Sequence, residues 1–265
     1  MPLSKPQAQI FADTNRFRVV SAGRRFGKSF LSIWEMARAA RMPNQKVMYV
    51  APSYRQAKSI IWDELKSQLI SKRWVKKINE SELSILLVNG SSITLRSADA
   101  GDSIRGISCD FVVLDECAFF INDSKVWTDI IRPTLSDRQG SALFISTPQG
   151  MGNWFYDLYQ QGHTIDGWSS HQYTTAEGGN VPEEEIEAAK RDLDTKTYLQ
   201  EYEASFQSSG NVIYYAFKPA NIRKFEQVVP NQLHVGLDFN VSKMAAIVAA
   251  KYTDGLHIFL SLIHI

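Results

Sequence analysis

The sequence predicts an α/β protein built on a mostly parallel β-sheet with helices on both faces. Three observations support this fold class. Strand-like apolar segments recur at residues 17–21, 46–51, 111–114 and 142–146, and a helical pattern follows each of them. A glycine-containing loop joins the first strand to its helix, and two carboxylates follow the third strand directly. Such alternation of strands and helices is typical of parallel sheets.

The composition limits the number of domains and the classes of protein to which the chain can belong. With 265 residues, 44% hydrophobic and 22% charged, the chain can bury a full core and forms one to two domains. No stretch reaches the roughly 18 apolar residues of a membrane span, and residues 1–5 lack the apolar core of a secretory signal. We therefore expect an intracellular protein with no membrane segment. The formal net charge of +1 is too balanced to indicate nucleic-acid binding, so any DNA contact must come from local patches.

The loop after the first strand reads as a phosphate-binding loop. It departs from G-x-x-x-x-G-K-[ST] at one position, where Ala22 replaces the first glycine. The residues that follow form the expected phosphate cradle: Gly23, Arg24, Arg25, Phe26, Gly27, Lys28 and Ser29. Backbone amides of such a loop face the β-phosphate, Lys28 reaches the β and γ oxygens, and the Ser29 hydroxyl ligates Mg²⁺.

Two adjacent acids, Asp115 and Glu116, follow the apolar strand 111–114. Open α/β sheets place their sites at this carboxyl end of the strands. Asp115 is expected to hold Mg²⁺ and Glu116 to polarise the attacking water. Neighbouring residues on an extended strand point to opposite faces, so we expect the two carboxylates to have different roles.

Two further signals are weaker. Ser146 and Thr147 end another strand, where they either contact the γ-phosphate or the lytic water, or mark an ordinary turn before Pro148. Arg105 precedes Gly106 on a loop before the acid pair. It is either a plain surface arginine or one presented to a phosphoryl group bound by a neighbouring subunit.

Turns and composition indicate the remaining organisation. Asn89-Gly90 joins strand candidates 83–88 and 92–96 in a hairpin, which predicts an antiparallel edge. Helices starting near Pro182 and spanning about 196–206 form a helical appendage. From residue 234, strands at 235–239, 245–251 and 256–260, with a turn at 253–255, open a second domain that has too few strands to be stable alone. The basic cluster at 72–77 is either a phosphate contact or a solvated helix end.

In order along the chain, these motifs resemble the large terminase subunits of tailed bacteriophages. The resemblance rests on residues 3–7, Arg24 to Ser29, residues 51–56, Arg105-Gly106, Leu114 to Glu116 and Ser146 to Pro148. It implies a DNA-packaging motor with an N-terminal P-loop ATPase of the additional-strand, RecA-like kind and a C-terminal ribonuclease H-like nuclease. The implied domains are an ATPase at 1–207 with a helical lid at about 174–207, a linker at 208–231, and an incomplete nuclease start at 232–265.

The resemblance also implies a role for each matching residue. Gln7 would contact adenine, Arg24 would grip the γ-phosphate, and Glu116 would be the catalytic base. Arg105 would enter the adjacent subunit, while Ser146 and Thr147 would couple hydrolysis to movement. The implied cofactors are ATP and Mg²⁺, and the implied partners are double-stranded DNA, a portal protein, a small terminase subunit and further copies in a ring, all in the cytoplasm of the infected host.

Two other function classes stay open at this stage. One is a helicase-like DNA-dependent ATPase, although such enzymes pair two ATPase folds in one chain. The other is a structural protein that binds ATP without turnover, against which the set Lys28, Asp115 and Glu116 argues.

Asp238 matches the first metal ligand of the nuclease domain. Two-metal phosphodiester cleavage needs several carboxylates converging on one site, and residues 239–265 do not supply them. We therefore expect the purified 265-residue chain to leave plasmid DNA uncut in the presence of Mg²⁺, as judged by gel electrophoresis. Robust cleavage would contradict this expectation.

Overall fold

The computed structural model describes residues 2–121, 123–207, 233–238, 245–252 and 255–263. It divides the chain into two compact units, Met1–Val212 and Ile213–Ile265, and each is described by itself. The predicted linker at 208–231, the residue Phe239 and most of the predicted turn at 253–255 lie outside the described residues.

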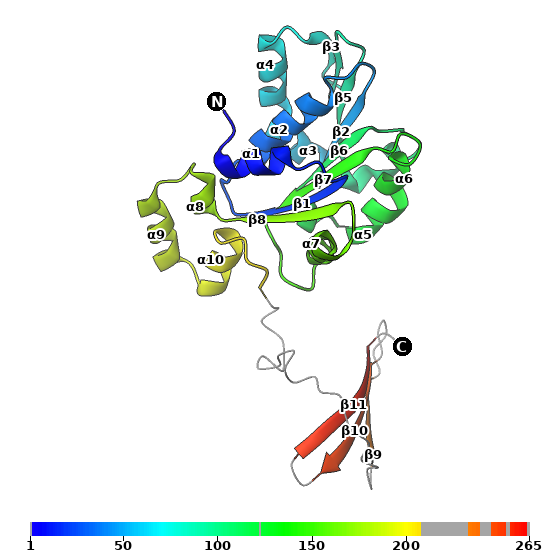
Figure 1. Cartoon of the computed structure of the whole chain (residues 1–265), viewed down its shortest axis with the longest axis vertical. Coiled ribbons are helices and arrows are strands. Elements are labelled where there is room, and N and C mark those ends of the chain that lie inside the picture. The colour runs from blue at the N-terminus through cyan, green and yellow to red at the C-terminus, as the bar shows by residue number, and fades with distance from the viewer. Residues whose placement is uncertain (1, 122, 208–232, 239–244, 253–254, 264–265) are drawn as a thin grey trace. The chain divides into compact units, whose positions relative to one another are not determined.

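The first unit is built on an eight-stranded sheet in the order β3-β4-β5-β2-β6-β7-β1-β8 (Figure 1). Its strands are β1 Phe17–Ala22, β2 Lys46–Ala51, β3 Val75–Asn79, β4 Ser84–Leu87, β5 Ser92–Ser97, β6 Phe111–Asp115, β7 Ser141–Ser146 and β8 Trp168–Tyr173. The strands from β5 to β8 in this order run parallel, whereas β3, β4 and β5 pair antiparallel. The four predicted parallel strands and the antiparallel edge with its hairpin are confirmed.

Two strands were not predicted from the sequence, and both lie at edges of the sheet. β3 contains Lys76 and Lys77 of the basic cluster, which is therefore only in part a helix end. Exposed lysines on an edge strand discourage pairing with other chains. β8 reads Trp-Ser-Ser-His-Gln-Tyr and is largely half-buried, so it shows no apolar alternation. Trp168 begins this strand.

Helices cover both faces of the sheet, as the fold class requires. One core layer packs α1 Lys5–Ala12, α2 Lys28–Ala39, α3 Tyr54–Ala57, the π-helical turn Lys58–Trp62 and α4 Asp63–Ser71 against the strands. The other face carries α5 Asp123–Lys125, α6 Arg132–Thr134, α7 Trp154–Thr164, the 3₁₀ turns Ala98–Ser103 and Cys117–Phe119, and the π-helical turn Val126–Ile131. Cys109 and Cys117 are free cysteines buried in the core.

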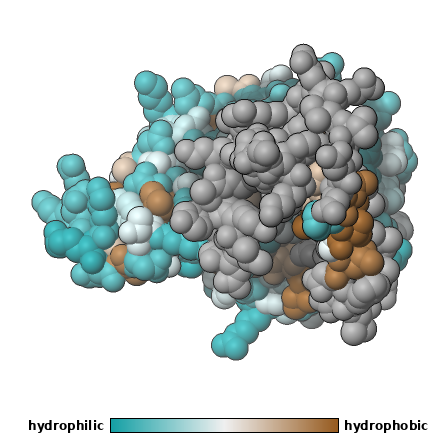
Figure 2. Space-filling view, turned by 90° about the horizontal axis from the view of Figure 1, so that it is seen from below, coloured by the Kyte–Doolittle hydropathy of each residue, from teal (hydrophilic) through white to brown (hydrophobic). Residues whose placement is uncertain are grey.

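The helical appendage consists of α8 Thr175–Gly178, α9 Glu183–Asp192 and α10 Thr195–Glu201. Its surface is chiefly hydrophilic, as the left side of Figure 2 shows. The last helix ends at Glu201 and not near residue 206, so the predicted boundary was wrong. The reason is that Phe206 returns to the core, where its ring lies 5.9 Å from that of Phe155 and 5.0 Å from that of Tyr159.

The second unit contains three antiparallel strands in the order β11-β10-β9: β9 Leu233–Asp238, β10 Ala245–Tyr252 and β11 Gly255–Ile263. They match the three predicted strands closely. Asp238 is the last residue of β9. Across both units, none of the helices in the described ranges has the length and apolar character to cross a membrane.

A buried ion network joins α1, β1 and α2. The Arg18 guanidinium donates two hydrogen bonds to the Glu35 carboxylate, at 2.6 and 2.9 Å, and a third to the carbonyl of Ile10 at 3.0 Å. Arg38 pairs with the same carboxylate and donates to the carbonyl of Phe11. Because Arg18 and Glu35 are almost completely buried, removal of one partner would leave an unpaired charge in the core. The network therefore fixes α1 against the body of the domain.

Asp13, just after α1, makes a second link between α1 and the edge strand β8. Its carboxylate accepts hydrogen bonds from Ser169 at 2.5 Å and from Asn15, and its Oδ2 lies 2.7 Å from Nε2 of His171. Burial alone would raise the pKa of Asp13, but these hydrogen bonds outweigh it and lower the pKa to about 2. His171 thus helps to link β8 to the residue that follows α1.

Asp13→Asn should lower the free energy of unfolding at neutral pH. The difference between the variant and the unmodified chain should shrink in acid. Because the folded pKa of Asp13 lies below the unfolded value of about 3.9, the carboxylate stabilises the fold above pH 4. That contribution disappears as the pH falls from about 4 toward 2. Urea unfolding of both proteins between pH 7 and pH 3 measures the difference. The exposed Asp166→Asn is the matched control, and a stability gap independent of pH would contradict the prediction.

Candidate functional site

The carboxyl ends of three neighbouring strands bring the predicted chemistry together. β1 leads through the phosphate-binding loop to Lys28, β6 ends at Asp115, and β7 leads to Thr147. The Lys28 Nζ donates to Thr147 Oγ1 at 2.8 Å and lies 3.7 Å from Oε1 of Glu116. It also donates to the carbonyl of Ala22 at 3.1 Å. The lysine, the acid pair and the hydroxyl residues thus form one cluster.

Glu116 does not continue the strand, although the sequence predicts an extended acid pair. β6 ends at Asp115, and Glu116 has a φ of 49°, which is left-handed and rare for a residue with a side chain. This turn aims its carboxylate at β7, where Oε2 accepts from the Ser146 hydroxyl at 3.3 Å and from the Thr147 amide at 3.5 Å. Strain of this kind concentrates at functional sites.

Asp115 occupies a different environment. It is 1% exposed and accepts hydrogen bonds from the Tyr49 hydroxyl at 2.5 Å and from the Glu116 amide at 3.0 Å. Burial, and then the negative charge of Glu116, raise its pKa to about 6. Burial and the Asp115 carboxylate also raise the pKa of Tyr49, so its hydroxyl stays protonated and donates.

The donor chemistry around Asp115 fits a hard divalent cation. Two adjacent carboxylates share a site in which one is fully buried, and the charge of that pair favours a bound cation. Asp115 and the Ser29 hydroxyl would supply oxygen ligands, which Mg²⁺ prefers.

The phosphate-binding loop has the backbone shape of an anion site. Arg25 and Gly27 have φ values of 61° and 95°, and α2 begins at Lys28 with amides that have no partner within the helix. A hollow of about 950 Å³ opens beside this loop. It is lined by residues 2–7, by Arg24, Arg25, Gly27, Lys28, Ser29, Phe30 and Glu116, and by residues 177–180 of the appendage.

The end of β8 and the appendage hold the first half of the loop through its backbone. The Gly23 amide donates to the Tyr173 carbonyl at 3.0 Å, and the Arg24 amide donates to the Glu201 carbonyl at 2.7 Å. The Thr175 hydroxyl donates to the Arg24 carbonyl at 2.7 Å. A Cβ on Gly23 would lie 2.5 Å from that hydroxyl oxygen and 2.7 Å from the Thr175 amide nitrogen. Glycine is therefore required at position 23.

Ala22 has no comparable restriction. It ends β1, is completely buried, and belongs to the core beside the strands. The departure from the usual motif at this position thus fits the packing.

The side chain of Arg24 points to the appendage. Its guanidinium forms an ion pair with the Glu201 carboxylate at the end of α10, and 64% of the arginine side chain is exposed. The sequence offered no signal for this partner, because 177 positions separate the two residues.

Gln7 lies against the loop from the side of α1. Its Nε2 donates to the carbonyls of Phe26 at 3.3 Å and Gly27 at 3.1 Å, and its Oε1 accepts from the Ser4 amide at 2.9 Å. Gln7 is 3% exposed. From the appendage, Asn180 also donates to the carbonyl of Phe26, at 3.1 Å.

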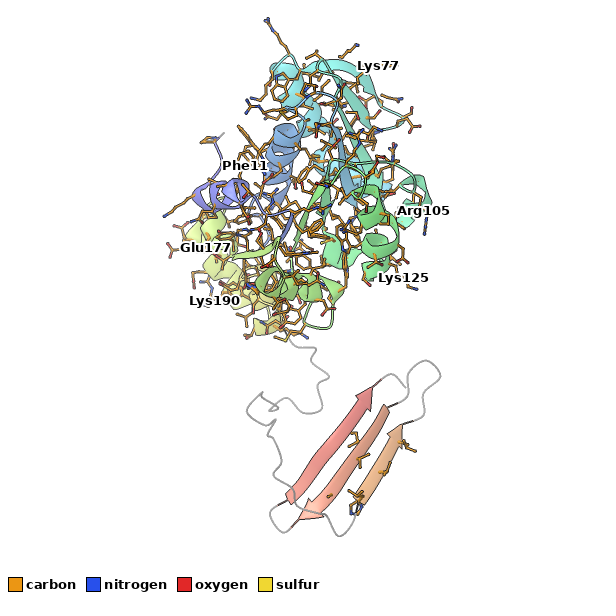
Figure 3. All side chains as sticks on the ribbon, turned by 45° about the vertical axis from the view of Figure 1, so that its right-hand side comes forward. Phe11, Lys77, Arg105, Lys125, Glu177 and Lys190 are labelled. Atoms are coloured by element: carbon orange, nitrogen blue, oxygen red, sulfur yellow. The ribbon has the colours of Figure 1, made fainter. Side chains whose placement is uncertain are left out.

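Arg105 is exposed and does not join this cluster. Figure 3 shows it on the far side of the unit from Glu177, which lines the hollow. The structure thus separates Arg105 from the other predicted residues of the ATPase site. Asp238 belongs to the second unit, and within the described residues no group of three or more His, Cys, Asp or Glu side chains is arranged to hold a metal ion.

The chain matches one protein family and is similar in sequence to several known proteins. Residues 19–218 match the family described as terminase large subunit, T4likevirus-type, N-terminal. The chain is 32% identical over 250 residues to the large terminase subunit of Escherichia phage T5, a match that covers 90% of this chain and 56% of that protein. It is 31% identical over 175 residues to the large terminase subunit of Thermus phage G20c, covering 59% of this chain and 36% of that protein.

Solved structures agree with this relationship. The ATPase domain of the Thermus phage P74-26 large terminase superposes with a TM-score of 0.67 at 27% identity, covering 77% of this chain and 94% of that one. The large terminase of a second thermophilic bacteriophage shares the fold with a TM-score of 0.69 at 15% identity, covering 99% of this chain and 68% of that one. The chain spans about half the length of the T5 protein that it matches. With a family match over residues 19–218 and a 32% identical relative, this chain belongs to the large terminase subunits of tailed bacteriophages.

Proposed function

We propose that this chain hydrolyses ATP as the ATPase part of a phage DNA-packaging motor. The observation that carries the proposal is the cluster at the sheet edge, where Lys28 lies 3.7 Å from Glu116 beside a hollow large enough for a nucleotide. The large terminase of the second thermophilic bacteriophage, which has the same fold, forms complexes with ADP and with ATP-gamma-S. An additional-strand, RecA-like classification of the first unit belongs to this proposal.

In the proposed reaction, the amides at the start of α2 and the Lys28 ammonium hold the β and γ phosphates. Lys28 must turn away from Thr147 and the loop carbonyls to do so. Glu116 orients the attacking water and accepts its proton. Ser29 and Asp115 would hold Mg²⁺, which would neutralise the negative charge that develops during transfer.

The contacts of Ser146 and Thr147 support a coupling role. Ser146 also accepts a hydrogen bond from the Ala118 amide, so one hydroxyl bridges the end of β7 and the turn after Glu116. Thr147 contacts both Lys28 and Glu116. If Lys28 or Glu116 moves during hydrolysis, these hydrogen bonds would transmit the movement to the end of β7 and to the loop that follows it.

Arg24 would have to leave Glu201 in order to grip the γ-phosphate. The arginine lines the hollow, and its partner lies at the end of α10. The γ-phosphate and the Glu201 carboxylate would thus compete for the Arg24 guanidinium. Binding of a triphosphate would release α10 from this ion pair.

We further propose that Arg105 completes the site of an adjacent copy in a ring, because it is exposed and distant from its own hollow. Double-stranded DNA, a portal protein and a small terminase subunit are the proposed partners in the cytoplasm of the infected cell. The strand ending at Asp238 is proposed to belong to a nuclease domain.

Glu116→Gln should bind ATP with little change in affinity but lose at least about 100-fold in hydrolysis, because the variant cannot accept the proton of water. Phosphate release and nucleotide binding measure the two effects separately. The matched control is Glu177→Gln, which changes a carboxylate that lines the same hollow and caps α8 and should leave hydrolysis largely intact. Equal losses in the two variants would argue against Glu116 as the base.

Arg105→Ala should bind ATP normally and hydrolyse it poorly, with a loss on the order of 10³-fold if the arginine acts in trans. Mixing with a binding-defective Lys28→Ala chain should restore part of the activity, because each variant supplies what the other lacks. Lys125→Ala, on the same side of the unit in Figure 3, is the control. The absence of rescue in the mixture would rule out a shared site.

A further inference from the structure

A second hollow of the first unit, here called the tryptophan groove, lies on the face of the sheet that carries α2 and α4. It encloses about 360 Å³ and shares no residue with the hollow beside the phosphate-binding loop. A smaller hollow of about 220 Å³ adjoins it, because Arg41 and Trp74 line both. The apolar part of its wall comes from the side chains of Phe11, Ile33, Trp34, Leu69 and Trp74.

The local sequence explains why two indole rings line this groove. Trp34 and Ala37 lie three positions apart on α2 and so share one side of the helix, where the small alanine leaves space beside the ring. After α4, Arg73 turns the chain with a φ of 56°, and the Trp74 amide donates to the Leu69 carbonyl at 3.2 Å. Both tryptophans are half-buried, so each ring keeps an accessible part.

The charges around the groove have one sign. Its lining residues and those of the adjoining hollow include three cations and no carboxylate. Arg38 pairs with Glu35, but in the described part of the chain Arg41 and Lys72 form no ion pair with a carboxylate. Both residues are exposed, and the Lys72 Nζ lies 5.8 Å from the centroid of the Trp34 ring. A negative group bound here would meet two cations that have no competing acid.

The indole N–H groups of the groove are also available. Trp62, which lies outside it, donates its indole N–H to Glu80 at 2.6 Å. No residue that the structure describes accepts a hydrogen bond from the indole of Trp34 or Trp74, and neither nitrogen is a buried donor without a partner. These two donors therefore reach solvent and can serve an outside acceptor such as a carboxylate.

An acidic peptide fits these features better than a nucleic acid does. The bases of a double helix are stacked inside it, and a single base would bury its polar edges against a wall that is mostly apolar. A large apolar side chain fills the groove without that cost. Carboxylates beside it in the sequence are the natural partners of the exposed cations.

We propose that the tryptophan groove docks an acidic segment of a partner protein. A large apolar side chain of that segment occupies the groove, and its carboxylates pair with Arg41 and Lys72. Figure 3 shows Phe11, which lines the groove, on the opposite side of the unit from Arg105. Docking thus leaves free the side that we propose faces an adjacent copy, and the inference does not depend on the ATPase proposal.

The test measures binding of short fluorescein-labelled peptides to the 265-residue chain by fluorescence anisotropy. The first peptide has a central phenylalanine flanked by aspartates, and three others replace either the phenylalanine by serine or the aspartates by asparagines or lysines. The serine peptide should bind at least about tenfold more weakly than the first, because the ring is no longer buried. The asparagine peptide should bind about three- to tenfold more weakly, because it forms no ion pair.

Arg41→Glu should reverse the charge preference of the groove. It should weaken binding of the aspartate peptide about tenfold and strengthen binding of the lysine peptide, because attraction and repulsion exchange places. Lys125→Glu is the matched control, since it makes the same change of charge at an exposed residue outside the groove and should leave both affinities unchanged. Trp34→Ala should bind the phenylalanine and serine peptides equally. ATP hydrolysis should be the same in Arg41→Glu and the unmodified chain.

Three results would overturn the inference while leaving the ATPase proposal intact. The first is equal binding of the aspartate and asparagine peptides, or binding of neither. The second is an Arg41→Glu chain that binds the aspartate peptide as tightly as Lys125→Glu does. The third is a single-stranded or duplex oligonucleotide, or a second copy of the chain detected by sedimentation, that occupies the groove while the aspartate peptide does not. Circular dichroism establishes that each variant folds, and if Trp34→Ala does not, the peptide series and Arg41→Glu still decide.

Discussion

The shape of the phosphate-binding loop is the constraint on which the rest of this site depends. The amides of Gly23 and Arg24 donate to protein carbonyls, so the loop leaves its later amides for an anion, and its own buried carbonyls need partners as well. Here Gln7 and Asn180 donate to the carbonyls between Arg25 and Gly27, and Thr175 donates to that of Arg24. Segments from both ends of the first unit thus close around one short stretch of backbone.

The parallel sheet supplies the second half of the site. β6, β7 and β1 are neighbours in space although β1 lies far from the other two in sequence. Their common carboxyl edge gathers an ammonium group, two carboxylates and two hydroxyls. The left-handed turn at Glu116 then gives the two acids different surroundings, one dry and held by Tyr49, the other facing Ser146 and Thr147.

Sequence reasoning found the features that depend on local pattern. The central strands have apolar runs, the hairpin has Asn89-Gly90, and the loop has its Gly-Lys-Ser core, so each could be read directly. The edge strands β3 and β8 could not, because half-buried polar residues give neither a helical nor a strand period. The end of α10 was missed because Phe206 packs against α7, a tertiary contact that the local sequence does not show.

In the site, the motifs pointed to Lys28 and the acid pair, and the structure brings these residues together. The contacts of Asn180 and Glu201 with the phosphate-binding loop could not be predicted from the sequence, because both residues lie more than 150 positions from the loop.

The position of the first residues has a practical consequence. Pro2, Leu3 and Ser4 form part of the wall of the hollow, and the buried Arg18–Glu35 pair anchors the helix that follows them. An affinity tag fused before Pro2 would start from this wall, beside the space that a nucleotide would occupy. Enzymatic measurements on this chain are therefore best made with a tag that is cleaved off or attached elsewhere.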